Sequence, residues 1–205
     1  MTTMEKIMER PEVKVLLGMM KLSNIETYRH SISVASLVEK MLNCASQSTF
    51  TEYEREQIIE GALLHDIGKI FLPFNLTQLP SSLSDSQYDI IKIHASISYE
   101  VVKSTFSDIV QNICLYHHEK PNGNGYMAQI KLKDIPDEAL LVQIADVYDA
   151  MTSERSYKKS FTPEQSIKIM ESDCEKFLLD DRYFILLKKV LIERKILQNG
   201  KEQKK

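Results

Sequence analysis

The sequence predicts an all-α fold for this chain of 205 residues. Apolar residues recur at i, i+3 and i+4 spacings along almost the whole chain, as they do on the buried face of a helix. Glycine and proline number only six each, and no run of alternating β-branched residues indicates a strand. The length suffices for one well-buried domain but is short for two, so we expect a single helical domain.

Four capping boxes predict where helices begin. In this motif a serine or threonine side chain accepts a hydrogen bond from the backbone three residues on, and a glutamate or glutamine there reaches back. The four pairs are Ser23–Glu26, Thr51–Glu54, Ser84–Gln87 and Thr162–Gln165. Pro136 and Pro163 suit the first turn of a helix, and Gly68 suits the end of one. Together with the apolar pattern, these signals predict helices near residues 2–20, 24–45, 52–67, 85–104, 108–118, 137–152, 163–177 and 180–197.

The first predicted helix precedes the rest of the domain. Its apolar residues, Val13, Leu16, Leu17 and Met20, lie at helical spacing. We expect residues 1–21 to form a helix that packs on the core, with a dimer seam as the alternative. The domain then covers residues 22–198, and residues 199–205 are a polar tail that is expected to fray.

Composition and charge exclude several function classes. There are 26 Lys and Arg residues against 29 Asp and Glu, and a net charge of −3 gives no broad electrostatic reason to bind long nucleic acid. The longest apolar stretch near the start, residues 15–20, is too short to span a bilayer and follows acidic residues, so we expect a cytoplasmic protein without a membrane segment. Three widely spaced cysteines indicate buried free thiols rather than disulfides or a thiolate zinc site.

The histidines carry the main functional signal. The five are His30, His65, His94, His117 and His118, and two long loops, 69–83 and 119–135, lie beside them. His65 opens an HDIGK run at a predicted helix end, and Asp146 lies in a helix where it can project inward and would need a partner. Singly, each of these residues has an ordinary structural interpretation. Their joint presence predicts a site.

Imidazole and carboxylate ligands suit iron, manganese, zinc or nickel. Asp66 is the candidate to bridge two ions, which at a separation of about 3.5–4 Å would activate water and stabilise the oxygens of a phosphate ester. Lys69 could then neutralise charge that develops on the phosphoryl group. We therefore predict Asp66 and Lys69 as the catalytic residues.

The order and spacing of these residues over about residues 22–180 resemble the HD-GYP phosphodiesterases. Residues 117–126, HHEKPNGNGY, are similar to the signature loop of that family, and residues 146–153, DVYDAMTS, to its second signature. The resemblance implies an HD-domain helical bundle with additional HD-GYP helices. It also implies hydrolysis of a cyclic dinucleotide, most often cyclic di-GMP and sometimes cyclic GMP-AMP, to linear dinucleotide or GMP by a metal-bound hydroxide.

The resemblance also implies which residues form the site. Lys69, Tyr126, Arg155 and Lys158 would contact the substrate. In members with three ions a glutamate one turn before the first histidine joins the site, and Glu26 holds that position here, although the Ser23 capping box explains it equally well. Two or three divalent ions are expected, iron or manganese before nickel or zinc. The implied metal ligands are Glu26, His30, His65, Asp66, His94, His117, His118 and Asp146.

The chain departs from the family pattern at a few positions. Met127 stands where the family has the proline of Gly-Tyr-Pro, and Ser156 replaces another proline. Because proline fixes φ, Met127 predicts a more mobile loop. These changes bear on substrate choice and partner docking, whereas the metal ligands are intact.

Two other functions stay open at this point. The chain could act on another nucleotide within the HD superfamily, against which the signature loop argues. It could instead sense a cyclic dinucleotide or dock a partner without turnover, against which the intact ligands argue. Only about twenty residues precede the helix of His30, so we expect regulation by a protein partner or through a homodimer.

Overall fold

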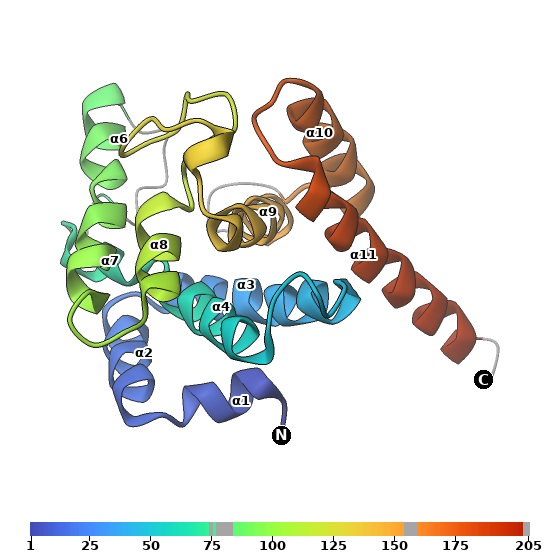
Figure 1. The fold of residues 1–205 in the computed structure, drawn as a ribbon, viewed down its shortest axis with the longest axis horizontal. Coiled ribbons are helices and arrows are strands. Elements are labelled where there is room, and N and C mark those ends of the chain that lie inside the picture. The colour runs from blue at the N-terminus through green and yellow to red at the C-terminus, as the bar shows by residue number, and fades with distance from the viewer. Residues whose placement is uncertain (74–75, 77–83, 154–159, 203–205) are drawn as a thin grey trace.

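The computed structural model describes residues 1–73, 76, 84–153 and 160–202, the last nine of these without their side chains. The described residues contain helices and no strand, which confirms the all-α prediction (Figure 1). In the described part of the chain, two 3-10 helices, η1 (Ile67–Phe71) and η2 (Leu132–Asp134), lie between α-helices. The α-helices are α1 (Thr3–Met8), α2 (Pro11–Ser23), α3 (Ile25–Cys44), α4 (Glu52–Leu64), α6 (Asp85–Lys92), α7 (His94–Val102), α8 (Asp108–Tyr116), α9 (Asp137–Thr152), α10 (Pro163–Glu175) and α11 (Asp181–Glu202).

The helix starts follow the sequence signals with one correction. Both hydrogen bonds of the capping box form at Thr51, Ser84 and Thr162. The Ser23 box is wrong, because Ser23 is the last residue of α2. Asn24 caps α3 instead, and its side chain accepts hydrogen bonds from the backbone N–H groups of Glu26 and Thr27, both at 3.0 Å. Glu26 is therefore not held in a capping box with Ser23.

Two predicted helices are each two helices in the structure. The helix predicted for residues 2–20 is interrupted at Arg10. The extended backbone of Arg10 (φ −61°, ψ 131°) is the conformation that a following proline imposes. Residues 85–104 break at Ile93, where α6 ends and α7 begins. The second break places His94 at the first position of a new helix.

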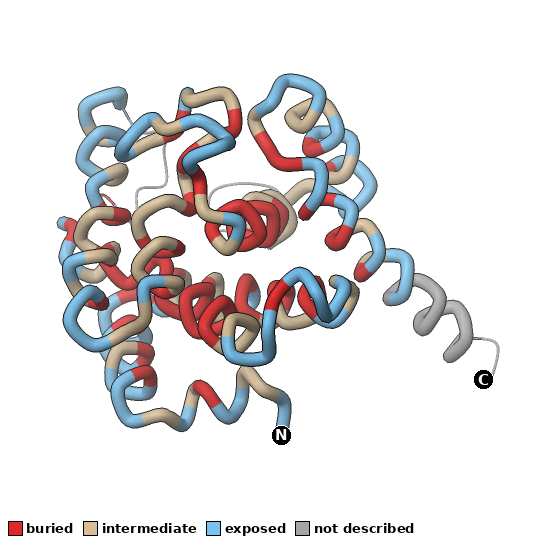
Figure 2. The backbone as a smooth tube through the Cα atoms, viewed as in Figure 1, coloured by how far each residue is buried: buried red, intermediate tan, exposed pale blue. Residues whose placement is uncertain are grey.

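The core lies between α3, α4, α8 and α9, and most of α9 is buried (Figure 2). Helices α4 and α8 pack closely at Gly61, where an added Cβ would clash with the side chain of Ile113. Because His65 and His117 follow the last turns of α4 and α8, this close packing brings the two histidines together.

The N-terminal helices pack on this core. Ile7, Val13, Leu17 and Met20 are buried. Arg10 donates to Glu60 at 3.0 Å and to Glu56 at 2.5 Å, which ties the α1–α2 junction to α4.

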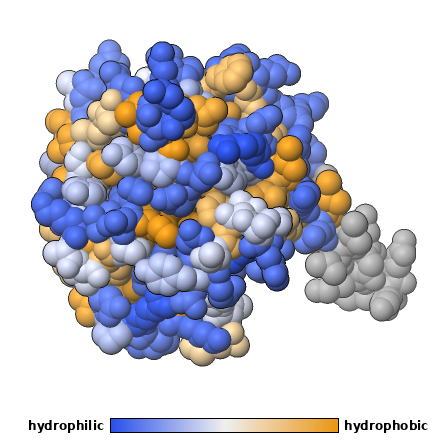
Figure 3. Space-filling model, viewed as in Figure 1, coloured by the Kyte–Doolittle hydropathy of each residue, from blue (hydrophilic) through white to orange (hydrophobic). Residues whose placement is uncertain are grey.

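The outer surface is mixed in character. On the face in view, apolar residues are scattered in small groups among hydrophilic ones (Figure 3), as is ordinary for a globular protein surface. No helix within the described residues has the length and apolarity needed to cross a membrane.

Candidate metal centre

Seven of the predicted metal ligands come from helix ends and helix faces around one buried point. His65 and Asp66 follow α4, His94 begins α7, and the pair His117 and His118 follows α8. His30 lies on α3, and Asp146 on α9. All are buried except His30 and His118, which are partly exposed.

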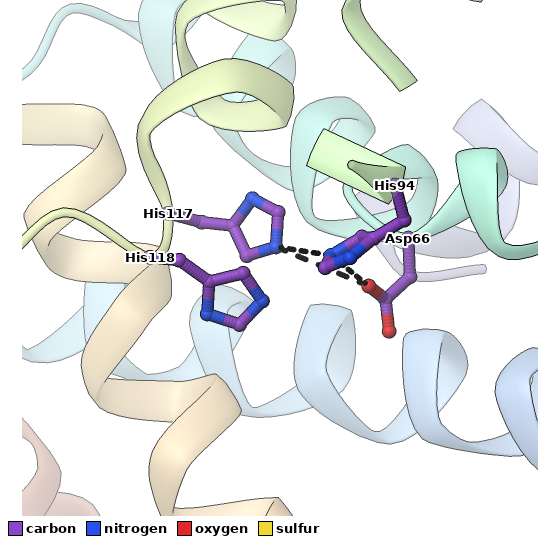
Figure 4. Close-up of side chains that lie close together, drawn as sticks. All are labelled: Asp66, His94, His117 and His118. Carbon is purple, nitrogen blue, oxygen red and sulfur yellow. Dashed lines mark hydrogen bonds and ion pairs between the residues drawn. The ribbon is translucent and has the colours of Figure 1, made fainter. Parts of the chain in front are cut away.

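Within the described residues, Asp66 belongs to both of the residue groups that could hold a metal ion. One group is Asp66, His94, His117 and His118 (Figure 4), and the other is His30, His65 and Asp66. Each carboxylate oxygen faces one group. Oδ1 lies 3.1 Å from Nε2 of His94 and 3.9 Å from Nε2 of His117. Oδ2 lies 3.5 Å from Nε2 of His65 and 3.8 Å from Nε2 of His30. This arrangement suits a carboxylate that bridges two ions.

Backbone carbonyl groups determine which nitrogen of three histidines faces the site. Nδ1 of His65 donates to the carbonyl of Ala62 at 2.8 Å, and Nδ1 of His94 donates to that of Ile91 at 2.7 Å. Nδ1 of His117 lies 3.0 Å from the carbonyl oxygen of Ile113. Because a carbonyl oxygen can only accept, Nδ1 carries the proton in each ring and Nε2 presents a lone pair to the site.

The inward-facing atoms of the site need a cation. Nε2 of His94 and Nε2 of His117 lie 3.3 Å apart, and with Nδ1 protonated both are acceptors. Nε2 of His65 and Oδ1 of Asp66 are buried without a hydrogen-bond partner. Burial lowers the pKa of His117 to about 3 and lowers the pKa of His65 as well, so protonation does not relieve this crowding at neutral pH. The residues therefore fit divalent metal ions.

His30 is held by two carboxylates. Its Nε2 lies 2.9 Å from Oδ1 of Asp146, and its Nδ1 lies 2.7 Å from Oδ2 of Asp149. Burial would lower the pKa of His30, but the bonds to Asp146 and Asp149 outweigh it and raise that pKa to about 9. Ser33 also donates to Asp149. Sequence reasoning missed Asp149, although its position three residues after Asp146 puts both on one face of α9.

Asp146 lies between the two groups without belonging to either. Its Oδ1 contacts His30, and its Oδ2 lies 4.0 Å from Nδ1 of His118. Burial opposes its ionisation, yet the neighbouring imidazoles of His30, His65 and His118 hold the pKa of Asp146 well below its usual range. It is a carboxylate placed to serve an ion on either side.

Glu26 is part-buried in the first turn of α3, one turn before His30, and neither group includes it. Lys69 pairs with Asp66, its Nζ 2.5 Å from Oδ2. Two predicted substrate contacts, Arg155 and Lys158, lie outside the described residues.

Tyr126 lies at the edge of the site, with its ring centroid 4.6 Å from that of His118. Glu119 is fully buried, and its Oε1 accepts from the N–H groups of Ala128 at 2.6 Å and Gln129 at 3.0 Å. Gln143 on α9 donates to the carbonyl groups of His117, at 3.1 Å, and Glu119. Sequence reasoning missed Glu119 and Gln143, which fix the ends of the loop that carries Tyr126.

Gly68 lies inside η1 rather than at a helix end. Its N–H donates to Ser98 of α7 at 2.8 Å, and an added Cβ would clash with the carbonyl of His94. The glycine of the HDIGK run therefore allows η1, which follows Asp66, to approach α7.

Known proteins have sequences similar to that of this chain. A cyclic di-GMP phosphodiesterase from Thermotoga maritima is 34% identical over 165 residues, which cover 78% of this chain and 44% of that protein. A 3'3'-cGAMP-specific phosphodiesterase from Vibrio cholerae is 32% identical over 143 residues, or 68% of this chain and 27% of that protein. The chain thus spans less than half the length of these curated relatives.

Solved structures have the same fold. Bd1817, an HDG"Y"P protein from Bdellovibrio bacteriovorus, superposes with a TM-score of 0.67 at 23% identity, covering 92% of this chain and 60% of that one. The HD domain of the L. monocytogenes phosphodiesterase PgpH, solved in complex with cyclic-di-AMP, gives 0.62 at 21% identity, covering 94% and 98%. The HD domain family model matches residues 25–182. The chain therefore belongs to the HD domain family, as its resemblance to the HD-GYP proteins predicted.

Proposed function

We propose that the chain is a metal-dependent phosphodiesterase that hydrolyses a cyclic dinucleotide, with cyclic di-GMP as the first substrate to test. The observation that carries the proposal is the position of Asp66, with one carboxylate oxygen toward each of two groups of buried imidazoles. The printed names of the relatives, cyclic di-GMP and cGAMP phosphodiesterases, support the same substrate class.

The first ion would be held by Asp66, His94, His117 and His118, and the second by His30, His65 and Asp66, with Asp146 within reach of both. Iron or manganese is the proposed metal, and Glu26 is the proposed ligand of a third ion. When bound, such ions would supply a nucleophile at neutral pH and neutralise charge on the phosphoryl oxygens.

The chain itself would orient the phosphate. The Lys69 ammonium has three N–H donors, of which one reaches Asp66, so two remain for phosphoryl oxygens. Burial, and then the charges of Tyr88, Asp66 and Asp146, raise the pKa of Tyr126, which keeps its phenol neutral and able to donate. We propose Lys69 and Tyr126 as substrate contacts on these grounds, and Arg155 and Lys158 on the family resemblance alone.

The test is hydrolysis of cyclic di-GMP by anaerobically purified protein loaded with ferrous or manganous ion, with bound metal counted on the same sample. We expect turnover by protein that holds two or three ions per chain. Chromatography of the products then distinguishes linear dinucleotide from GMP. Asp66→Ala should lose turnover and bound metal because the shared ligand is gone, whereas Asp173→Ala on α10 serves as a control.

Two outcomes would contradict the proposal. If the Asp66→Ala variant still hydrolyses the substrate, the proposed metal site is wrong. Full metal occupancy without hydrolysis of cyclic di-GMP or cyclic GMP-AMP would instead indicate a module that binds the nucleotide and does not cleave it.

A further inference from the structure

Helix α6 carries an aromatic ring and an ammonium group that the site described above does not use. Tyr88 and Lys92 lie one turn apart on the same face of this helix. Nζ of Lys92 lies 4.8 Å from the ring centroid of Tyr88 and 5.9 Å from that of Tyr126. Asp89 accepts a hydrogen bond from Lys92 at 2.8 Å and so orients the ammonium.

Three rings lead from the metal centre to the surface. His118 and Tyr126 are 4.6 Å apart between centroids, tilted by 32°. Tyr88 follows, 6.5 Å from Tyr126 and nearly perpendicular to it at 82°. Tyr88 is 47% exposed, so part of its ring is open to a ligand. In Figure 1, α6 stands beside the loop that follows α8 and carries Tyr126.

The protein core does not explain this placement of Tyr88. Helix α6 has no buried residue, and Tyr88 is not among the side chains that pack against the core cluster. Among the described residues its hydroxyl has no hydrogen-bond partner. Yet α6 is tied to the site, because the carbonyl of Ile91 accepts the Nδ1 proton of His94 at 2.7 Å. The helix therefore holds an accessible ring at a defined position beside the metal centre.

We infer that Tyr88, with Lys92 beside it, forms a nucleobase subsite on which one purine of the substrate stacks while a phosphate of the same molecule lies at the histidine cluster. This inference rests on the proposed function. Every base offers a π-face to an aromatic ring, and the ammonium adds positive charge next to an anionic ligand. A phosphate bound at the histidine cluster would not contact Tyr88, because the ring of Tyr126 lies between them.

The test compares cyclic di-GMP kinetics of the metal-loaded protein with those of Tyr88→Ala and Tyr88→Phe. A base that stacks on an aromatic ring gains binding energy, so Tyr88→Ala should raise KM about tenfold and leave kcat within about twofold, the pattern expected when ground state and transition state lose the same interaction. Tyr88→Phe keeps the ring and should restore the KM. Tyr53→Ala is the matched control, since Tyr53 is 64% exposed at the opposite end of α4 from His65.

A second readout separates the base from the phosphate. GMP and ribose 5-phosphate carry the same phosphate, but only GMP has a base, so wild-type protein should be inhibited more strongly by GMP, by about tenfold. Tyr88→Ala should lose this preference, and Tyr88→Phe should retain it. Lys92→Gln should weaken GMP inhibition by a smaller factor that decreases with added salt.

Failure of the subsite and failure of the proposed function are distinguishable. If wild-type protein hydrolyses cyclic di-GMP but Tyr88→Ala keeps both its KM and its preference for GMP, the subsite is wrong and the phosphodiesterase stands. If metal-loaded wild-type protein cleaves no cyclic dinucleotide, both proposals are wrong.

Discussion

At the scale of single residues, Asp149 is the group whose role is clearest from contacts. Its Oδ2 lies 2.7 Å from Nδ1 of His30, and its Oδ1 accepts a hydrogen bond from Ser33 on the same helix. The bonds to His30 and Ser33 outweigh burial and lower the pKa of Asp149, so it is an anion at neutral pH. A carboxylate behind a metal-binding histidine fixes the ring orientation and raises its basicity.

Asp149→Asn should therefore weaken metal binding about 10–100-fold, the usual effect of losing such a partner. Asparagine can still accept from His30 but carries no charge, so the fold should persist. Metal titration at pH 7 and above pH 9 measures the effect, because the second condition removes proton competition at His30, whose pKa is about 9. An unchanged affinity at both pH values would show that Asp149 is only structural.

At the scale of elements, the loop after α8 carries Tyr126, the proposed substrate contact, and is held at both ends. Its start is bonded to α9 through Gln143, and Glu119 accepts two backbone N–H groups from its far side. Asn122 donates to the carbonyl of Phe177 at 2.9 Å, beyond α10. Met127 is 39% exposed. That this loop is more mobile than a loop with proline at this position stays a prediction.

Glu119→Ala should destabilise the protein by about 1.5–3 kcal/mol, because the backbone N–H groups of Ala128 and Gln129 lose the charged acceptor of their part-buried hydrogen bonds. It should also raise KM, since Tyr126 lies in the released loop. Glu119→Gln keeps an acceptor oxygen and should lose less. Urea unfolding gives the free energy, and a value for Glu119→Ala within about 0.5 kcal/mol of wild type would contradict this role of the carboxylate.

At the scale of the whole molecule, a buried cluster of histidines and carboxylates links stability to pH and metal. Burial lowers the pKa of His65, His117 and His118, so these rings stay neutral in the folded chain and can take up protons on unfolding. The stability that this neutrality provides is present above the ordinary pKa of about 6.5 and is lost as the pH falls below it. His30 has the opposite sign: its raised pKa adds stability below about 6.5 that is lost as the pH rises toward 9.

Metal-free protein, prepared with a chelator, should therefore melt at a lower temperature at pH 5 than at pH 7. Loading with manganese at pH 7 should raise the melting temperature, with about 2.7 kcal/mol of stabilisation at a free-ion concentration 100 times Kd. Thermal unfolding followed by circular dichroism measures both effects. A metal-free melting temperature that does not change between pH 5 and 7 would mean that the cluster does not control stability.

The sequence by itself determined the helical class and most helix starts, because these depend on local signals, and it predicted a site at the five histidines and Asp66. The capping box at Thr51 spans four residues, and the HDIGK run spans five. The local signals failed where two of them competed. Ser23 and Asn24 can both cap a helix, and the continuation of α2 through Ser23 leaves the role to Asn24.

Only the tertiary structure decided how these residues act together. Asp149 meets His30 across 119 positions of sequence, and Glu119 meets the far side of its own loop. The packing of α3, α4, α7 and α8 decides that each carboxylate oxygen of Asp66 faces a different group of histidines. Tertiary packing also brings Tyr88 close to Tyr126. Apart from the contact within the Glu119 loop, these contacts arise from packing between elements far apart in the chain, and no local pattern encodes them.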